Sequence, residues 1–142
     1  MSYFAKALGP GQQREAMVNL AIKTLTPVLD KFDAIVVRGL SGVSGGAIIA
    51  WELDKPLIIF RKEKEVQTTG FSHGGPVEQS YVIDPSKLQR LLAVDDFKSS
   101  GATLTGIRTD APKLMLPTTK VVGHYLYNNG TLEFYIEVGV TK

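Results

Sequence analysis

Two adjacent carboxylates followed by small and hydroxylated residues form the segment best suited to chemistry. It reads Leu91-Leu-Ala-Val-Asp95-Asp96-Phe-Lys-Ser-Ser-Gly-Ala-Thr103. Small residues at the start of a helix leave backbone N–H groups open to a phosphate, and serine and threonine hydroxyls add donors. Asp95 and Asp96 suit sugar hydroxyls, or Mg²⁺ bound through water. The alternative interpretation is an ordinary strand-to-helix turn in which an aspartate caps the helix.

Two basic turns suit a polyphosphate. Arg38 and Gly39 follow the apolar run that ends at Val37, and Arg61-Lys-Glu-Lys64 follows a second apolar run. The planar guanidinium group of arginine binds pairs of phosphate oxygens. Ligands of an open parallel sheet bind beyond the carboxyl ends of its strands, so these turns and the acidic turn predict one shared cleft. The alternatives are a tight turn with close helix packing at 39–46 and a solvated charge run at 61–64.

The elements that position these turns alternate between helix and strand. Apolar spacing predicts helices over 12–29, 47–53 and 102–109, and short apolar runs predict strands over 32–37, 57–60, 91–94, 121–127 and 132–138. A glycine-rich turn is expected over 39–46, a mobile lid loop over 65–80 and a short strand over 81–83. Asn128-Asn-Gly130 is a strong hairpin signal. The pattern predicts an α/β fold with a mostly parallel sheet flanked by helices, and a C-terminal β-hairpin as its antiparallel edge.

Composition limits the class of protein. The 142 residues fit one domain, 1–142, and the absence of cysteine excludes disulfides and a cysteine nucleophile. Residues 1–71 carry nine Lys/Arg and seven Asp/Glu, and residues 72–142 carry seven of each, so no broad nucleic-acid surface is expected. No run approaches the ~20 apolar residues of a membrane helix, and no signal peptide is recognised. We expect a cytoplasmic protein without a membrane or nucleic-acid partner.

The acidic segment resembles the phosphoribosyl-pyrophosphate signature of the type I phosphoribosyltransferases. Four apolar residues, two acids and a Ser-Gly-Ala-Thr ending match that signature, apart from a small Ala93 where a larger aliphatic residue is common. The resemblance implies that Asp95 and Asp96 are catalytic and hold the ribose hydroxyls and, indirectly, Mg²⁺. It implies that the 5′-phosphate is bound by the loop that follows, made of Lys98, Ser99, Ser100, Gly101, Ala102 and Thr103.

The basic turns resemble other loops of the same family. Residues 36–42 look like the diphosphate loop of adenine phosphoribosyltransferases, which implies diphosphate binding by Arg38, Gly39, Leu40 and Ser41 and often includes a cis peptide bond. Arg61-Lys62-Glu63-Lys64 with His73 is similar to the closing loop of orotate phosphoribosyltransferases, which implies diphosphate binding by Arg61 and catalytic roles for Lys62 and Lys64. Here Lys64 comes one residue earlier than in that pattern, and about eight residues separate it from His73. The resemblance covers residues 32–109.

The function implied is transfer of a phosphoribosyl group from phosphoribosyl pyrophosphate to an unassigned nucleobase, with a homodimer as the expected assembly. The alternative is a non-catalytic sensor of phosphoribosyl pyrophosphate or nucleotides with the same fold. Four aromatic residues near the C-terminus are candidates to stack on the base or, alternatively, to pack in the core: Tyr125, Tyr127, Phe134 and Tyr135.

A competing motif is the Gly42-Val-Ser44-Gly-Gly46 segment, which matches a hydrolase nucleophile elbow with His124 downstream. An elbow serine sits directly at the end of a strand, whereas Ser44 comes six residues after Val37, so a serine hydrolase is disfavoured. Two distant histidines and no cysteine predict no zinc site.

Overall fold

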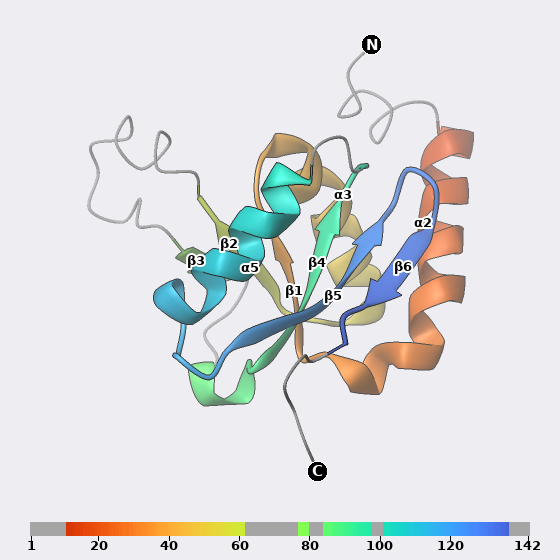
Figure 1. Ribbon diagram of the computed structural model, residues 1–142. Helices are drawn as coiled ribbons and strands as arrows, with labels where there is room; N and C mark the ends of the chain where they lie inside the picture. The colour runs from red at the N-terminus through yellow and green to blue at the C-terminus, as the bar shows by residue number, and fades with distance from the viewer. Residues whose placement is uncertain (1–10, 62–76, 80–83, 98–100, 137–142) are drawn as a thin grey trace.

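The computed structural model describes residues 11–61, 77–79, 84–97 and 101–136, and they form one six-stranded sheet with helices on both faces (Figure 1). Along the chain the elements are α2 (Gly11–Leu25), the 3₁₀ helix η1 (Thr26–Lys31), β1 (Ala34–Val37), α3 (Leu40–Leu53), β2 (Leu57–Phe60), β3 (Val77–Gln79), the 3₁₀ helix η2 (Pro85–Lys87), β4 (Arg90–Asp95), α5 (Ala102–Leu114), β5 (Lys120–Leu126) and β6 (Thr131–Phe134).

The strand order is β3-β2-β1-β4-β5-β6. The four inner strands β2, β1, β4 and β5 are parallel, and β3 and β6 pair antiparallel at the two edges. The predicted α/β fold with a mostly parallel sheet and a C-terminal hairpin is therefore confirmed. The expectation that both C-terminal strands form an antiparallel edge is wrong for β5, because β5 continues the parallel sheet beside β4.

Helices cover the sheet unequally. On one face α2 and α3 pack against a core cluster that includes Leu25, Ile49 and Tyr125, and on the other α5 packs against a cluster that includes Ile107 and Leu91. All four residues of β1 are buried, as are the last five of β4. Strands covered on both faces read as continuous apolar runs, which is why the sequence located them well.

The glycine-rich segment is the largest correction to the predicted elements. A turn over 39–46 is wrong, because α3 begins at Leu40 and runs through Gly45 and Gly46. A Cβ atom on Gly45 would lie 2.3 Å from the Tyr127 ring, and one on Gly46 would lie 2.4 Å from Val37 Cγ1. These glycines lower helix propensity, but they let α3 approach the sheet closely, and tertiary packing outweighs propensity.

Two helix ends also differ from the predicted ones. The first helix ends at Leu25, and the chain tightens into η1 around Pro27, which has no N–H to continue the α-helical pattern. The predicted helix over 102–109 extends to Leu114 with Pro112 inside it, because the buried stripe of Leu104, Ile107 and Ala111 continues. No helix in the described ranges is long and apolar enough to span a membrane.

Two other expectations fall mainly outside the described residues. The predicted strand over 81–83 lies there, as does most of the predicted lid over 65–80. Within that second range, Val77–Gln79 forms β3, which pairs antiparallel with β2. The strand expected over 132–138 ends at Phe134 in the structure.

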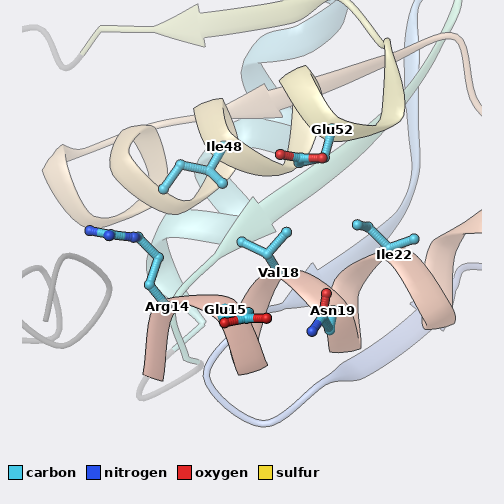
Figure 2. A pocket seen from close by; sticks show the side chains of 7 residues that line it. All are labelled: Arg14, Glu15, Val18, Asn19, Ile22, Ile48 and Glu52. Atoms are coloured by element: carbon cyan, nitrogen blue, oxygen red, sulfur yellow. The ribbon is translucent and has the colours of Figure 1, made fainter. Parts of the chain in front are cut away.

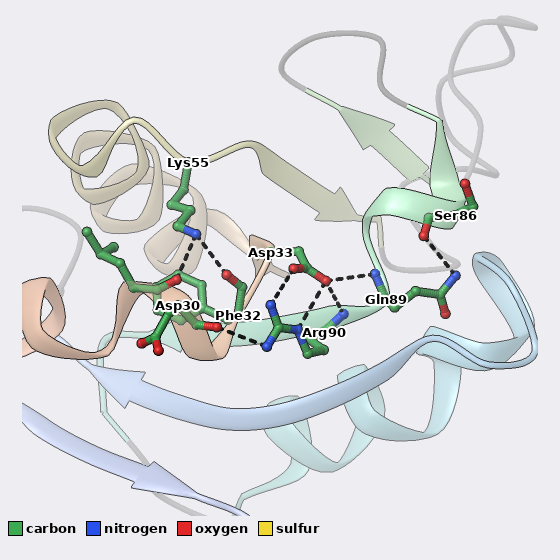
Figure 3. Close-up of polar contacts among 8 residues, drawn as sticks. Asp30, Phe32, Asp33, Lys55, Ser86, Gln89 and Arg90 are labelled. Carbon is green, nitrogen blue, oxygen red and sulfur yellow. Dashed lines mark hydrogen bonds and ion pairs between the residues drawn. The ribbon is translucent and has the colours of Figure 1, made fainter.

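A polar cluster secures the amino ends of the central strands (Figure 3). One carboxylate oxygen of Asp33, at the start of β1, accepts hydrogen bonds from the backbone N–H groups of Gln89 and Arg90 at 3.1 and 2.9 Å. The Arg90 guanidinium donates to the other oxygen at 2.8 Å. Nearby, Lys55 Nζ donates to the carbonyls of Leu29 and Phe32, both at 2.8 Å. The carboxyl ends of the strands lie at the opposite edge of the sheet and take no part in this cluster.

Candidate functional site

The carboxyl edge of the sheet collects the residues that follow the parallel strands. Strands β2, β1 and β4 end at Phe60, Val37 and Asp95. The turns predicted to form one cleft, which begin at Arg61, Arg38 and Asp95, therefore lie along the same edge. The β4–α5 and β1–α3 turns are adjacent, since β1 pairs directly with β4.

The acidic pair at the end of β4 is buried and oriented. Asp95 and Asp96 are 8% and 7% exposed. Asp95 Oδ1 accepts from the N–H of Asp96 at 2.9 Å, and Asp96 Oδ1 accepts from the N–H of Phe97 at 2.8 Å. Buried carboxylates need such partners to offset lost hydration. The bonds hold both side chains in one orientation, as a site that binds hydroxyl groups requires.

Helix α5 begins beside the acidic pair without a side-chain cap. Gly101 occupies the N-cap position with φ 81° and ψ 3°, in the left-handed region that favours glycine. Ala102 is exposed and Thr103 is half-buried. The first N–H groups of a helix lack internal acceptors and attract anions, so this helix start suits a phosphate. Lys98, Ser99 and Ser100, which were predicted to share this role, lie outside the described residues.

A second helix start lies next to the first. Gly39 has φ 87° and ψ 162°, a conformation that glycine tolerates, and it has no side chain to cap α3. Leu40 and Ser41, predicted as part of a diphosphate loop, are instead the first residues of α3. A Cβ atom placed on Gly42 would lie 3.7 Å from Asp95 Oδ1, so the first turn of α3 closely approaches the acidic pair. The peptide bonds of the described residues are all trans, so the cis bond implied for this turn is absent.

Both predicted arginines of the edge are engaged with acidic side chains. Arg38 forms an ion pair with Asp110 of α5 at 2.6 Å and donates to the carbonyl of Arg61 at 3.4 Å. Arg61 forms an ion pair with Glu78 of β3. The structure therefore brings Arg38 and Arg61 together and places a carboxylate beside each guanidinium group. Lys62, Lys64 and His73 lie outside the described residues.

The C-terminal aromatic residues pack in the core, which was the alternative to stacking on a base. Tyr125 is fully buried and Tyr127 is 4% exposed in the cluster beneath α2 and α3, and Phe134 packs against them. Tyr135 packs against the other cluster, and its hydroxyl lies 2.7 Å from His124 Nδ1. Packing in the core is thus confirmed for these side chains.

The serine hydrolase motif has no matching geometry. Ser44 lies inside α3, one turn past its first residue, and its hydroxyl donates to the carbonyl of Ser41 at 3.0 Å. His124 is buried in β5 against Tyr135. A nucleophile elbow needs its serine at the strand–helix corner, so this alternative is wrong.

A fourth turn at the carboxyl edge was missed from the sequence. The N–H groups of Tyr127 and Asn128, directly after β5, donate to the carbonyls of Asp95 and Asp96, both at 3.0 Å. The Tyr127 hydroxyl also donates to the carbonyl of Ser41 at 2.7 Å. This turn would have been expected at the site if β5 had been predicted as a parallel strand, because the carboxyl end of β5 then lies at the same edge as that of β4.

A separate groove lies between α2 and α3 (Figure 2). It has a volume of about 620 Å³ and is lined by Arg14, Glu15, Val18, Asn19, Ile22, Ile48 and Glu52. None of the residues predicted for the site lines it. No cluster of three or more metal-ligating acids, histidines or cysteines occurs within the described ranges.

Comparisons with known proteins agree with this architecture. No family model matches the chain. In sequence it is similar to a protein named hypoxanthine/guanine phosphoribosyltransferase from Aciduliprofundum boonei, with 33% identity over 113 residues, covering 74% of this chain and 58% of that protein. The chain spans about half the length of the curated relatives it matches.

Solved structures show the same fold. An orotate phosphoribosyltransferase from Aeropyrum pernix matches with a TM-score of 0.60 and 17% identity, over 84% of this chain and 60% of that one. An adenine phosphoribosyltransferase from Thermoanaerobacter pseudethanolicus matches with a TM-score of 0.51 and 20% identity, over 81% of this chain and 69% of that one.

Proposed function

We propose that this chain, which belongs to the type I phosphoribosyltransferase family, moves the 5-phosphoribosyl group of phosphoribosyl pyrophosphate to a nucleobase and releases diphosphate. The observation that carries the proposal is the carboxyl edge, where the buried pair Asp95 and Asp96 adjoins two helix starts without side-chain caps. A ribose has hydroxyls for the carboxylates, and its two phosphorylated ends suit the two helix starts.

Each part of the edge has a role in the proposal. Asp95 and Asp96 hold the ribose hydroxyls, and the loop over 98–103 holds the 5′-phosphate. The start of α3 at Gly39 holds the diphosphate. Arg38 and Arg61 leave their ion pairs with Asp110 and Glu78 to bind the diphosphate as well. A base nitrogen attacks C1 of the ribose while the bond from C1 to the diphosphate oxygen breaks, through an oxocarbenium-like transition state. Positioning and charge stabilisation supply the catalysis.

Magnesium fits this donor set. Mg²⁺ is typically held by one or two carboxylates, water and substrate phosphates, so it needs no larger acidic cluster. Asp95 and Asp96 would hold the ion through water or through the ribose, and the ion would neutralise charge on the leaving diphosphate. Lys62 and Lys64 are proposed to add positive charge there as catalytic residues.

The test of the proposal is an assay of diphosphate release with a panel of bases. The similar proteins are named for hypoxanthine and guanine, for orotate and for adenine. The panel therefore contains these four bases together with nicotinamide. Turnover with one base supports the enzyme and names its acceptor. Binding of phosphoribosyl pyrophosphate without turnover on any base supports the sensor instead. Lack of binding overturns both.

We propose a homodimer built on the outer face of α3. Trp51 is 84% exposed and Leu40 is 68% exposed on this helix, and Ile48 of the same helix lines the groove shared with α2. Tryptophan is enriched at protein interfaces, where its large ring leaves water and its N–H finds a partner. Sedimentation should give twice the mass of one chain, and Trp51→Glu should shift the protein toward monomer.

We further propose that residues 1–142 act as one cytoplasmic domain without a nucleic-acid partner. One sheet accounts for all the strands of the described part, and the net charge is only +2. The proposed donor is a phosphorylated sugar, which does not cross membranes unaided.

A further inference from the structure

Tyr127 connects the two turns that carry the proposed site. Its N–H donates to the carbonyl of Asp95 at 3.0 Å, and its hydroxyl donates to the carbonyl of Ser41 at 2.7 Å. The residue is 4% exposed, and its ring lies so close to Gly45 that a Cβ atom there would come within 2.3 Å. One side chain therefore spans from the end of β5 to the first turn of α3.

The carbonyl of Ser41 is where side chains anchor the start of α3. It belongs to the first turn of α3, whose N–H groups are the ones left without internal acceptors. Two hydroxyls donate to it, those of Tyr127 and Ser44, at 2.7 and 3.0 Å. Gly39 and Gly42 give this turn little side-chain packing of its own, so these bonds add to the packing of α3 on the sheet in fixing its position.

The Tyr127 hydroxyl is held in its protonated form, in which it can donate a hydrogen bond. Burial raises the pKa of Tyr127 to about 12; a hydrogen bond with Ser44 opposes the shift, and the nearby Asp95 and Asp96 add to it. The hydroxyl therefore stays protonated through the neutral range and can keep its bond to Ser41.

We propose that Tyr127 is a positioning residue that holds the N-terminus of α3 against the acidic pair, so that the free amides of α3 meet the diphosphate while Asp95 and Asp96 meet the ribose of the same molecule. This inference rests on the proposed function. It gives the hairpin after β5 a part in binding the phosphoribosyl donor.

The test compares two variants that each lose one tyrosine hydroxyl. Tyr127→Phe keeps the ring against Gly45 and removes the hydroxyl that bonds to the Ser41 carbonyl and interacts with Ser44. Tyr135→Phe is the matched control, because it removes a contact of the same 2.7 Å length, to His124, on the opposite core cluster. Binding of inorganic diphosphate with Mg²⁺ is measured by calorimetry, and KM for phosphoribosyl pyrophosphate and kcat are measured separately.

We expect Tyr127→Phe to weaken diphosphate binding and raise KM by roughly three- to tenfold, the effect of one lost hydrogen bond, with kcat within about twofold of the wild type. Tyr135→Phe should leave both constants unchanged while lowering the melting temperature about as much. Wild-type affinity in Tyr127→Phe, or equal weakening in both variants, overturns the positioning role alone. If the wild-type protein binds no diphosphate, the proposed function fails and this inference fails with it.

Ser44→Ala gives a second route to the same conclusion. It removes the other donor to the Ser41 carbonyl and leaves the bond from the Tyr127 hydroxyl to that carbonyl in place. It should weaken diphosphate binding in the same direction. If Tyr127→Phe does not fold, unchanged binding in Ser44→Ala overturns the proposal.

Discussion

Asp95 and Asp96 are two buried carboxylates that are stabilised by local hydrogen bonds. Each carboxylate accepts a bond from the N–H of the residue that follows it, and the carbonyl groups of both accept bonds from the turn after β5. These local bonds offset part of the cost of burial. They depend on an oxygen atom and not on its charge, so geometry and charge can be separated by mutation.

Asp96→Asn tests the charge. An asparagine keeps an oxygen for the N–H of Phe97 but cannot supply a negative charge to the ribose or to a metal ion. We expect turnover to fall roughly 10²- to 10³-fold, the scale for removing one preorganised electrostatic group. Steady-state kinetics measures it, with Asp30→Asn as a control that loses the same charge at an exposed site. Wild-type turnover in Asp96→Asn would contradict the assignment.

Gly101→Val tests the phosphate cradle. Gly101 has φ 81° at the start of α5, and a branched side chain both strains this backbone and crowds a phosphate at the helix start. We expect binding of phosphoribosyl pyrophosphate to be lost in calorimetry, at a temperature where circular dichroism shows the variant folded. Gly101→Ala should bind with intermediate affinity. Unchanged affinity in the folded valine variant would refute the cradle.

At the scale of elements, α3 shows why a glycine-rich segment can be a helix. Gly46 lies against Val37 and Gly45 lies against Tyr127, so the helix sits closer to the sheet than larger residues allow. This close approach brings the start of α3 beside the acidic pair. Glycine is used here for the space it leaves and not for backbone freedom.

Gly46→Ala should therefore destabilise the protein although alanine favours helix. The added Cβ would lie 2.4 Å from Val37 Cγ1, and overpacking of about 1–3 kcal/mol should exceed the gain of about 1 kcal/mol in propensity. Gly106→Ala in α5 is the contrast, since its Cβ meets only the tip of Arg38 at 3.0 Å, and it should be neutral or stabilising. Urea unfolding measures both, and equal stability changes would contradict the packing argument.

At the scale of the whole molecule, the two ends of the parallel sheet have different tasks. The carboxyl edge holds the candidate site, whereas the amino edge is closed by Asp33, Arg90 and Lys55 (Figure 3). Partial burial alone would raise the pKa of Asp33, but the bonds from Arg90 outweigh it and hold the pKa below its ordinary value of 3.8. Burial lowers the pKa of Lys55. The amino edge thus contributes to the stability of the fold.

Asp33→Asn should lower the free energy of unfolding by about 1–2 kcal/mol at neutral pH. A carboxyl whose pKa is lowered by folding stabilises the protein above its ordinary pKa, and this contribution is lost as the pH falls below 3.8 toward the folded value. The difference between wild type and variant should therefore shrink in acid. Unfolding followed from pH 7 to pH 3 measures it, with Asp30→Asn as the control. A constant difference across that range would contradict the role of Asp33.

Local patterns in the sequence were enough for the buried strands, the acidic pair and the glycine that starts α5. Each depends on neighbours a few residues away: apolar runs covered on both faces, and small residues before a helix. The start of α3 was not predictable in this way, because its glycines are explained only by their packing against the sheet. The end of the first helix was missed because the apolar spacing continues past Leu25, where Pro27 interrupts the helix.

The sequence by itself therefore determined the α/β class, the order of elements and the chemistry available at the carboxyl edge. Only the tertiary structure decided which groups meet there. The partners of Arg38 and Tyr127 lie 72 and 86 residues away, at Asp110 and Ser41. Such pairs form because a parallel sheet brings distant strand ends to one edge, and no local spacing in the chain encodes that meeting.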